Sequence, residues 1–253
     1  MIRYDRTSRR LAVVLLASLS PGALAWVPKL DETAARAVVD SAYDRRDDPV
    51  RTLLSLDLTV TDGAFAADLA PLEGSSDTTT SGDPGRTVRA FEGGDACVSN
   101  WLASPDDFAT YGSRPVSVTL TGQADEAFLL AQQGRDEFRN VTARDVLAKR
   151  DGALPDGHLR VYVAMRGLES EKQRDAYTVA IRAGQGQVAR PYRRGFTNDW
   201  KQDASGRWSG TMVYYFDALK AGAKPDGTLD VLLRTEADTD CAFSVTADLS
   251  KFY

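Results

Sequence analysis

The residues best suited to binding chemistry lie in one segment, between positions 190 and 200. Arginines and aromatic side chains alternate closely there, and they are Arg190, Tyr192, Arg193, Arg194, Phe196 and Trp200. Guanidinium groups donate paired hydrogen bonds to carboxylates and phosphates, and aromatic rings stack on flat groups and on cations. The pattern predicts a surface that binds a sugar, an acidic polymer or a phosphate. The alternative is a long hairpin loop whose rings pack onto a core while its arginines face water.

Aspartates in three predicted loops are candidate metal ligands. They are Asp106 with Asp107, Asp151 with Asp156, and Asp238 with Asp240. Calcium is held by carboxylate and carbonyl oxygens, as these residues could supply. Asp238 and Asp240 are tied closest to the predicted core and are the preferred calcium ligands, whereas solvated turn aspartates are the alternative. No other cofactor is predicted.

A single histidine, His158, excludes several mechanisms. Zinc sites with several histidines cannot form. A serine-histidine-aspartate triad would have to use His158, and no Gly-x-Ser-x-Gly elbow is present. Nucleotide-binding and EF-hand patterns are also absent. Paired carboxylates remain, because glycoside hydrolysis needs only two acids and leaves no spacing signature.

The first 25 residues predict an export signal. Four arginines precede the apolar run from Leu11 to Leu19, and Ala23-Leu24-Ala25 supplies small residues for cleavage before Trp26. The run is too short for a membrane anchor. Segment 8–13 partly resembles a twin-arginine signal, which exports folded proteins, so that route and the ordinary secretory route both stay open. We expect a periplasmic or secreted protein with no transmembrane anchor after cleavage.

The net charge limits the class of partner, and the two cysteines fit an oxidising destination. The whole chain has a net charge of −5, and removing four arginines and one aspartate with the signal leaves −8. A general nucleic-acid binder needs a basic face, so we expect no nucleic-acid partner. Cys97 and Cys241 are the only cysteines. An oxidising compartment favours a disulfide between them.

The N-terminal half predicts mixed elements. Asp31 can cap a short helix within segment 26–50. Alternating apolar residues from Leu54 to Val60 indicate a strand, with 65–69 as its hairpin partner. Segment 73–86 contains no large apolar side chain, which predicts a flexible loop. Segment 87–111 shows no regular pattern and is predicted to be a long irregular segment. A strand is expected at 116–120. Segment 127–131 could be strand or short helix, and Thr142 with Asp145 resembles a capping box.

The C-terminal half predicts five antiparallel strands, because apolar residues alternate around positions 161, 179, 214, 231 and 243, with turn formers between them. Their inner faces need a second layer, which the strands near 54 and 118 could supply. The predicted fold is therefore mostly β, an antiparallel β-sandwich with immunoglobulin-like or jelly-roll-like architecture. It has a short N-terminal helix and long irregular insertions, and 51–253 forms a single domain.

These patterns favour a non-catalytic, exported binding or interaction module with a protein or glycan partner. A carboxylate-pair enzyme acting on polysaccharide is the first alternative. A component of envelope assembly, with an exposed strand edge or apolar patch, is the second.

Overall fold

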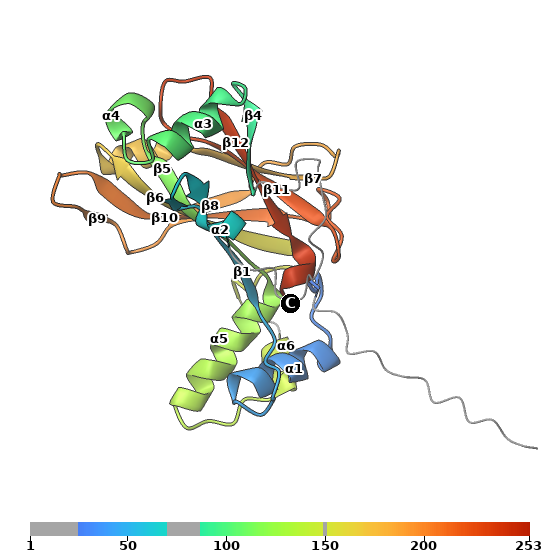
Figure 1. The fold of residues 1–253 in the computed structure, drawn as a ribbon. Helices are drawn as coiled ribbons and strands as arrows, with labels where there is room; N and C mark the ends of the chain where they lie inside the picture. Colours follow the sequence, from blue (N-terminus) through green and yellow to red (C-terminus); the bar gives the residue numbers. More distant parts are fainter. Residues whose placement is uncertain (1–24, 70–86, 149–150) are drawn as a thin grey trace, which may run out of the picture.

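The computed structural model describes residues 25–69, 87–148 and 151–253 (Figure 1). The predicted flexible loop at 73–86 and all of the predicted export signal except Ala25 lie outside the described residues.

A six-stranded antiparallel sheet forms the larger layer (Figure 1). Its main path contains β1 (Leu53–Asp57), β5 (Arg114–Thr121), β6 (His158–Leu168), β10 (Trp208–Asp217) and β8 (Arg193–Phe196), in that order. The short strand β9 (Lys201–Gln202) also pairs with β10. The sequence predicts the strands near 54 and 118 in a layer opposite all five C-terminal strands, but they lie in the same sheet as two of them, β6 and β10.

A second, four-stranded antiparallel sheet contains the other C-terminal strands. Its order is β4 (Val88–Glu92), β12 (Ala242–Asp248), β11 (Thr228–Arg234) and β7 (Thr178–Ala183). All five predicted strands exist, but two belong to the larger sheet and three to this one. Alternation in the sequence shows which side of a strand is apolar, and it does not show which strand is the neighbour.

Side chains from both sheets meet in one hydrophobic core. Val118 and Val163 come from the larger sheet, and Val231 and Val245 come from the smaller one; all four are fully buried. The alternate residues of β6 point away from this core, as the strand repeat requires. The six-stranded sheet thus has an inner face on the core and an outer face that carries polar and aromatic side chains.

Segment 87–111 is more regular than the sequence indicated. It contains β4, α3 (Ala96–Ala103) and α4 (Phe108–Tyr111). Trp101 of α3 packs edge-on against Phe65 and Phe243. The predicted disulfide is confirmed, since Cys97 of α3 is bonded to Cys241 immediately before β12, with the Cα atoms 5.7 Å apart. This segment is therefore held to the core by both a covalent bond and aromatic packing.

The hairpin expected after β1 is shorter than predicted. β2 (Val60–Thr61) pairs with β3 (Ala64–Phe65), and the chain then enters α2 (Ala66–Leu69). Residues 66–69 are therefore helical rather than part of a strand. Two 3-10 turns complete the fold, η1 (Glu171–Ala176) and η2 (Leu249–Lys251).

Three helices form a unit at one end of the molecule (Figure 1). They are α1 (Glu32–Ala42), α5 (Gln123–Asp136) and α6 (Ala143–Leu147), and they share a separate apolar core. The predicted cap is confirmed at Asp31, which accepts a hydrogen bond from Ala34 N, and the predicted capping box is confirmed at Thr142 and Asp145. Segment 127–131 lies within the 14-residue helix α5. Gly122 at its N-terminus offers no side-chain cap, so this helix had no clear start signal.

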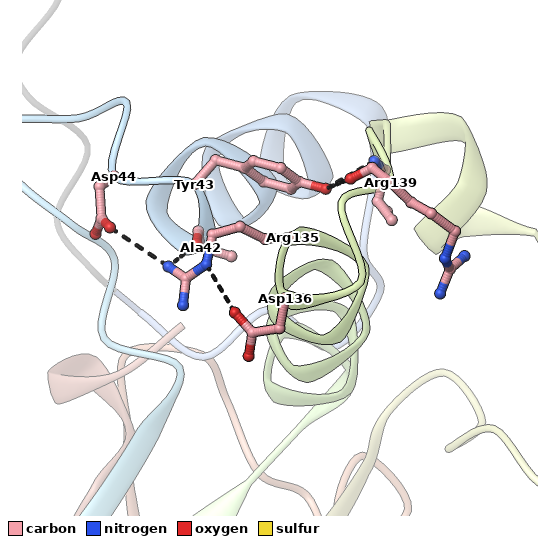
Figure 2. Close-up of polar contacts among 7 residues, drawn as sticks. Ala42, Tyr43, Asp44, Arg135, Asp136 and Arg139 are labelled. Atoms are coloured by element: carbon pink, nitrogen blue, oxygen red, sulfur yellow. Dashed lines mark hydrogen bonds and ion pairs between the residues drawn. The ribbon is translucent and has the colours of Figure 1, made fainter.

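Polar contacts join the ends of α1 and α5 (Figure 2). Arg135 donates to Ala42 O at 2.7 Å and forms ion pairs with Asp44 and Asp136. The Tyr43 hydroxyl donates to Arg139 O and accepts from Val141 N. Segment 26–50 is thus packed onto residues that follow β5, far along the chain.

Phe138 ends α5 in a conformation that favours glycine. Its φ is +59° and its side chain is 100% exposed. Phe138 N donates to Arg135 O and Arg139 N donates to Gly134 O, the hydrogen-bond pair of a Schellman motif. Phe138→Gly is expected to raise the free energy of unfolding by about 1 kcal/mol, because an L side chain with left-handed dihedrals is strained. Urea unfolding measures this change. Phe138→Ala keeps the strain and should stay close to wild type, so equal gains in both variants would contradict the explanation.

Candidate functional site

Strand alternation divides the six basic and aromatic candidates between two faces. In the pairing of β8 with β10, Arg193 lies opposite Tyr215 and Arg194 lies opposite Tyr214. Tyr214 is buried in the core, whereas Tyr215 lies on the outer face. Arg194 and Phe196 therefore share the inner side of β8, and Arg193 lies on the outer side.

The inner side of β8 is engaged within the protein. The Arg174 guanidinium lies 3.9 Å from the centroid of Phe196 and 4.8 Å from that of Trp200. Arg194 forms an ion pair with Asp175 at 3.3 Å. Trp200 lies against Gly210, where an added Cβ would come within 2.4 Å of the indole. These contacts fasten η1 to the sheet, and they leave Arg194, Phe196 and Trp200 with a structural role.

The outer side carries a row of side chains across four neighbouring strands. Thr121 of β5 lies opposite Arg160 of β6, Arg160 opposite Tyr215 of β10, and Tyr215 opposite Arg193 of β8. The Tyr215 ring has Arg160 at 5.5 Å and Arg193 at 4.8 Å from its centroid. One exposed-face tyrosine is thus bracketed by two guanidinium groups.

The two guanidinium groups of that row differ in charge balance. Arg160 forms an ion pair with Glu126 of α5, and both side chains are largely buried. Within the described part of the chain, Arg193 has no carboxylate within 4.0 Å. Arg160 therefore anchors the row to the helical unit, and Arg193 remains available to a ligand.

A hollow of about 610 Å³ opens beside this row. Its lining includes Tyr192, Arg190, His158, Asp217 and Lys220. Tyr192 is 55% exposed, and its ring lies 5.2 Å from that of His158 and 6.2 Å from that of Tyr215. The row and the hollow are therefore continuous through Tyr192, and together we call them the outer-face site.

Backbone hydrogen bonds place Arg190 and Tyr192 at the hollow. Ala189 exchanges two hydrogen bonds with Ile181 of β7, and Tyr192 N donates to Tyr215 O at 3.0 Å. The segment thus crosses from the smaller sheet to the larger one, with Arg190 between the two anchor points. On the opposite side, Asp217 accepts from Lys220 N at 2.9 Å and fixes the turn that carries Lys220.

The outer-face site contains three cations that have no carboxylate partner in the described part of the chain. In the described residues, none of Arg190, Arg193 and Lys220 lies within 4.0 Å of a carboxylate. Elsewhere arginines commonly do, as Arg182 with Asp230 shows. Unpaired cations beside exposed rings can bind anionic groups through charge-assisted hydrogen bonds.

Tyrosine hydroxyls at the site are donors at neutral pH. Burial raises the pKa of Tyr192, and the neighbouring Tyr215 raises it further. Burial likewise raises the pKa of Tyr162, which lies next to the site, on the same face of β6 as Arg160. Both therefore stay protonated and can donate a hydrogen bond to a bound oxygen.

No protein-family model, curated protein or solved structure significantly matches this chain.

Several residues of the outer-face site were missed by the sequence reasoning. Tyr215, Arg160 and Lys220 come from other strands and turns, and His158 was treated only as a possible catalytic residue. The sequence did contain a signal for these residues. Arginine and tyrosine occupy positions 160, 162 and 215, which the alternation of the strands assigns to the outward face. Which outward residues become neighbours depends on strand order, which alternation does not give.

The structure places the candidate calcium ligands differently: Asp151 and Asp156 line one hollow together with Glu126. Asp238 and Asp240 are both exposed, and the described part of the chain contains no group of three or more His, Cys, Asp or Glu side chains that could hold a metal. Asp107 instead caps α4 by accepting from Thr110 N. Among the described residues, no helix has the length and apolarity to cross a membrane.

Asp125 provides a pH-dependent test of the junction between α5 and the sheet. It is buried and accepts from Thr52 Oγ1 at 3.1 Å. Burial raises its pKa above the ordinary 3.8, and the bond from Thr52 and the charge of Arg160 oppose this. Folding therefore favours the protonated form of Asp125. Its stabilising contribution is complete at pH values below the pKa that Asp125 has in the unfolded chain. The contribution is lost as the pH rises through the pKa that Asp125 has in the folded protein.

Asp125→Asn keeps an acceptor for Thr52 and cannot ionise. We expect it to unfold at higher urea concentration than wild type at about pH 7, with a smaller difference at about pH 3. Urea midpoints at both values measure this. A difference that did not depend on pH would contradict the role assigned to the Asp125 charge.

Proposed function

We propose that this chain is an exported, non-catalytic binding module whose outer-face site holds an acidic glycan. The two sheets around one core support a β-sandwich of the general immunoglobulin-like or jelly-roll kind as its architecture. The disulfide supports an oxidising destination, in the periplasm or outside the cell.

One observation carries the choice of ligand. Arg190 and Lys220 line the hollow together with the exposed Tyr192, and Arg193 lies over Tyr215 in the adjoining row. None of the three cations has a carboxylate within 4.0 Å in the described residues, although the chain has a net charge of −5. The overall field repels anions, so attraction depends on this local group. An anionic ligand would satisfy the guanidinium and ammonium donors that the protein leaves open.

The shape of the site favours a chain of sugars over a small anion. Neighbouring strands are about 4.8 Å apart, so the row from β5 to β8 extends over roughly 14 Å. Tyr192, which is 55% exposed, offers a ring on which the apolar face of a sugar can lie. The Tyr215 ring beside it is covered by Arg160 and Arg193, whose guanidinium groups can face the charged groups of the same chain. An acidic glycan supplies both features in each repeating unit. Nucleic acid fits less well, because its charge density calls for a more extended basic face.

A matched pair of polymers tests the proposal. Polygalacturonate and its carboxyl-reduced, neutral form would be titrated into the mature protein by calorimetry, with chain length of the polymer followed in parallel. Binding of the acidic polymer alone, weakened by salt and without shortening, is the expected result. Equal binding of the neutral polymer would contradict the ionic basis. Shortening that one Asp or Glu substitution abolishes would establish the carboxylate-pair enzyme instead, and absence of all binding would reject the glycan in favour of a protein partner or an assembly role.

A further inference from the structure

The first residue after the predicted cleavage site is a core residue. Trp26 is 1% exposed and belongs to the main core between the sheets. Its indole lies on Gly122, where an added Cβ would come within 3.2 Å of Nε1. Such a large ring cannot leave this position without opening a cavity in the core.

The segment that follows Trp26 is fastened at three separate places. Trp26 N donates to Leu249 O at 2.8 Å, Gly157 N donates to Pro28 O at 2.6 Å, and Leu30 N donates to Gln123 Oε1 at 2.9 Å. These partners belong to η2, to the turn before β6 and to the start of α5. Residues 26–30 are therefore docked along their length, and Asp31 then caps α1.

The bond to be cut lies at the edge of this docked segment. Cleavage between Ala25 and Trp26 adds water to the Ala25 carbonyl carbon and breaks the bond to Trp26 N, leaving an Ala25 carboxylate and a Trp26 amino group. In the fold that same nitrogen donates to Leu249 O, and the side chain next to it is buried. A peptidase needs the chain extended and accessible on both sides of the bond, and the folded protein conceals the Trp26 side.

We infer that signal cleavage precedes closure of the fold, and that the chain is exported unfolded. This rests on the export signal assumed in the proposed function. It favours the ordinary secretory route over the twin-arginine route that segment 8–13 partly resembles, because the latter delivers chains that are already folded. Docking of Trp26 then follows cleavage and completes the core beside Gly122.

The test compares the full-length precursor with a spacer variant. The spacer variant carries five Gly and Ser residues between Ala25 and Trp26, which moves the scissile bond away from the docked segment and keeps Ala23 and Ala25. Both precursors would be folded and oxidised, then treated with a purified bacterial signal peptidase in detergent. Cutting of a folded chain follows the population of its open form, and burial of a tryptophan makes that population small. We expect the folded precursor to be cut about 100-fold more slowly than the folded spacer variant.

The same cleavage assay on unfolded precursors distinguishes failure of the inference from failure of the predicted export signal. In urea at a concentration that unfolds both precursors and spares the peptidase, equal cutting rates are expected. By mass spectrometry, the product should begin at Trp26 for the unmodified precursor and at the first spacer residue for the spacer variant. Equal rates for the two folded precursors would overturn the inference while leaving the export signal intact. Lack of cutting in both unfolded precursors would overturn the export signal itself and with it the inference.

Discussion

Replacing both Arg190 and Lys220 with alanine is expected to weaken binding of the acidic glycan by about 100-fold, and each single replacement by about 10-fold. Both side chains line the hollow, and neither has a carboxylate within 4.0 Å in the described residues. Their loss removes hydrogen bonds to ligand charge without leaving a protein carboxylate unpaired. Calorimetry at low and high salt would measure both the affinity and its ionic part.

Two variants serve as controls for this experiment. Arg194→Ala lies in the same segment, but its side chain is on the inner side of β8 and pairs with Asp175. Arg89→Ala removes an exposed arginine from β4 of the smaller sheet. Each control removes one positive charge, as each single site variant does, but from a residue outside the outer-face site. Both controls should therefore bind the glycan nearly as tightly as wild type. Equal weakening by Arg194→Ala and Arg190→Ala would show a general charge effect and contradict the outer-face site.

Loss of the disulfide is expected to have the largest effect on stability. Cys97 and Cys241 are 144 residues apart in sequence, and chain entropy assigns the closure of such a loop about 5 kcal/mol. The bond joins α3 to the start of β12, so Trp101 also depends on it for its place against Phe243. Urea unfolding of the variant in which both cysteines are serine is therefore expected to show a loss of about 3 to 5 kcal/mol.

The reduced wild-type protein is the control for that variant, because it loses the bond and keeps the sulfur atoms. The two should unfold at similar urea concentrations, both well below oxidised wild type. A loss under about 1 kcal/mol in both would contradict the stabilising role of the bond. A large loss in the serine variant alone would assign the effect to the hydroxyl groups, since Cys97 is buried.

The strands could be predicted from the sequence because each carries its own alternation. Leu159, Val161 and Val163 mark the inner face of β6 whatever the neighbouring strands are. The division into two sheets could not be predicted, because strand order depends on contacts between residues far apart in the chain. Helix α5 was ambiguous for a local reason: its apolar run is short, and Gly122 gives no capping signal.

The candidate site could be predicted in part. The segment from Arg190 to Trp200 was singled out by composition, and the structure keeps Arg190, Tyr192 and Arg193 at the hollow and the row beside it. It directs Arg194 and Phe196 to the opposite side, because β8 is a strand and neighbouring residues of a strand face opposite ways. Composition indicates only a binding surface or a loop at 190–200, and neither interpretation applies the alternation of a strand to these residues.

Mapping the ligand on the protein tests the central claim most directly. Backbone amide signals of isotope-labelled mature protein would be followed by NMR during titration with an acidic oligogalacturonate. The expected result is a set of shifts confined to the outer-face site, at residues 158–162, 190–193, 213–217 and 220. Shifts confined to the four-stranded sheet or to α1, α5 and α6, or no shifts at saturating ligand, would contradict the account.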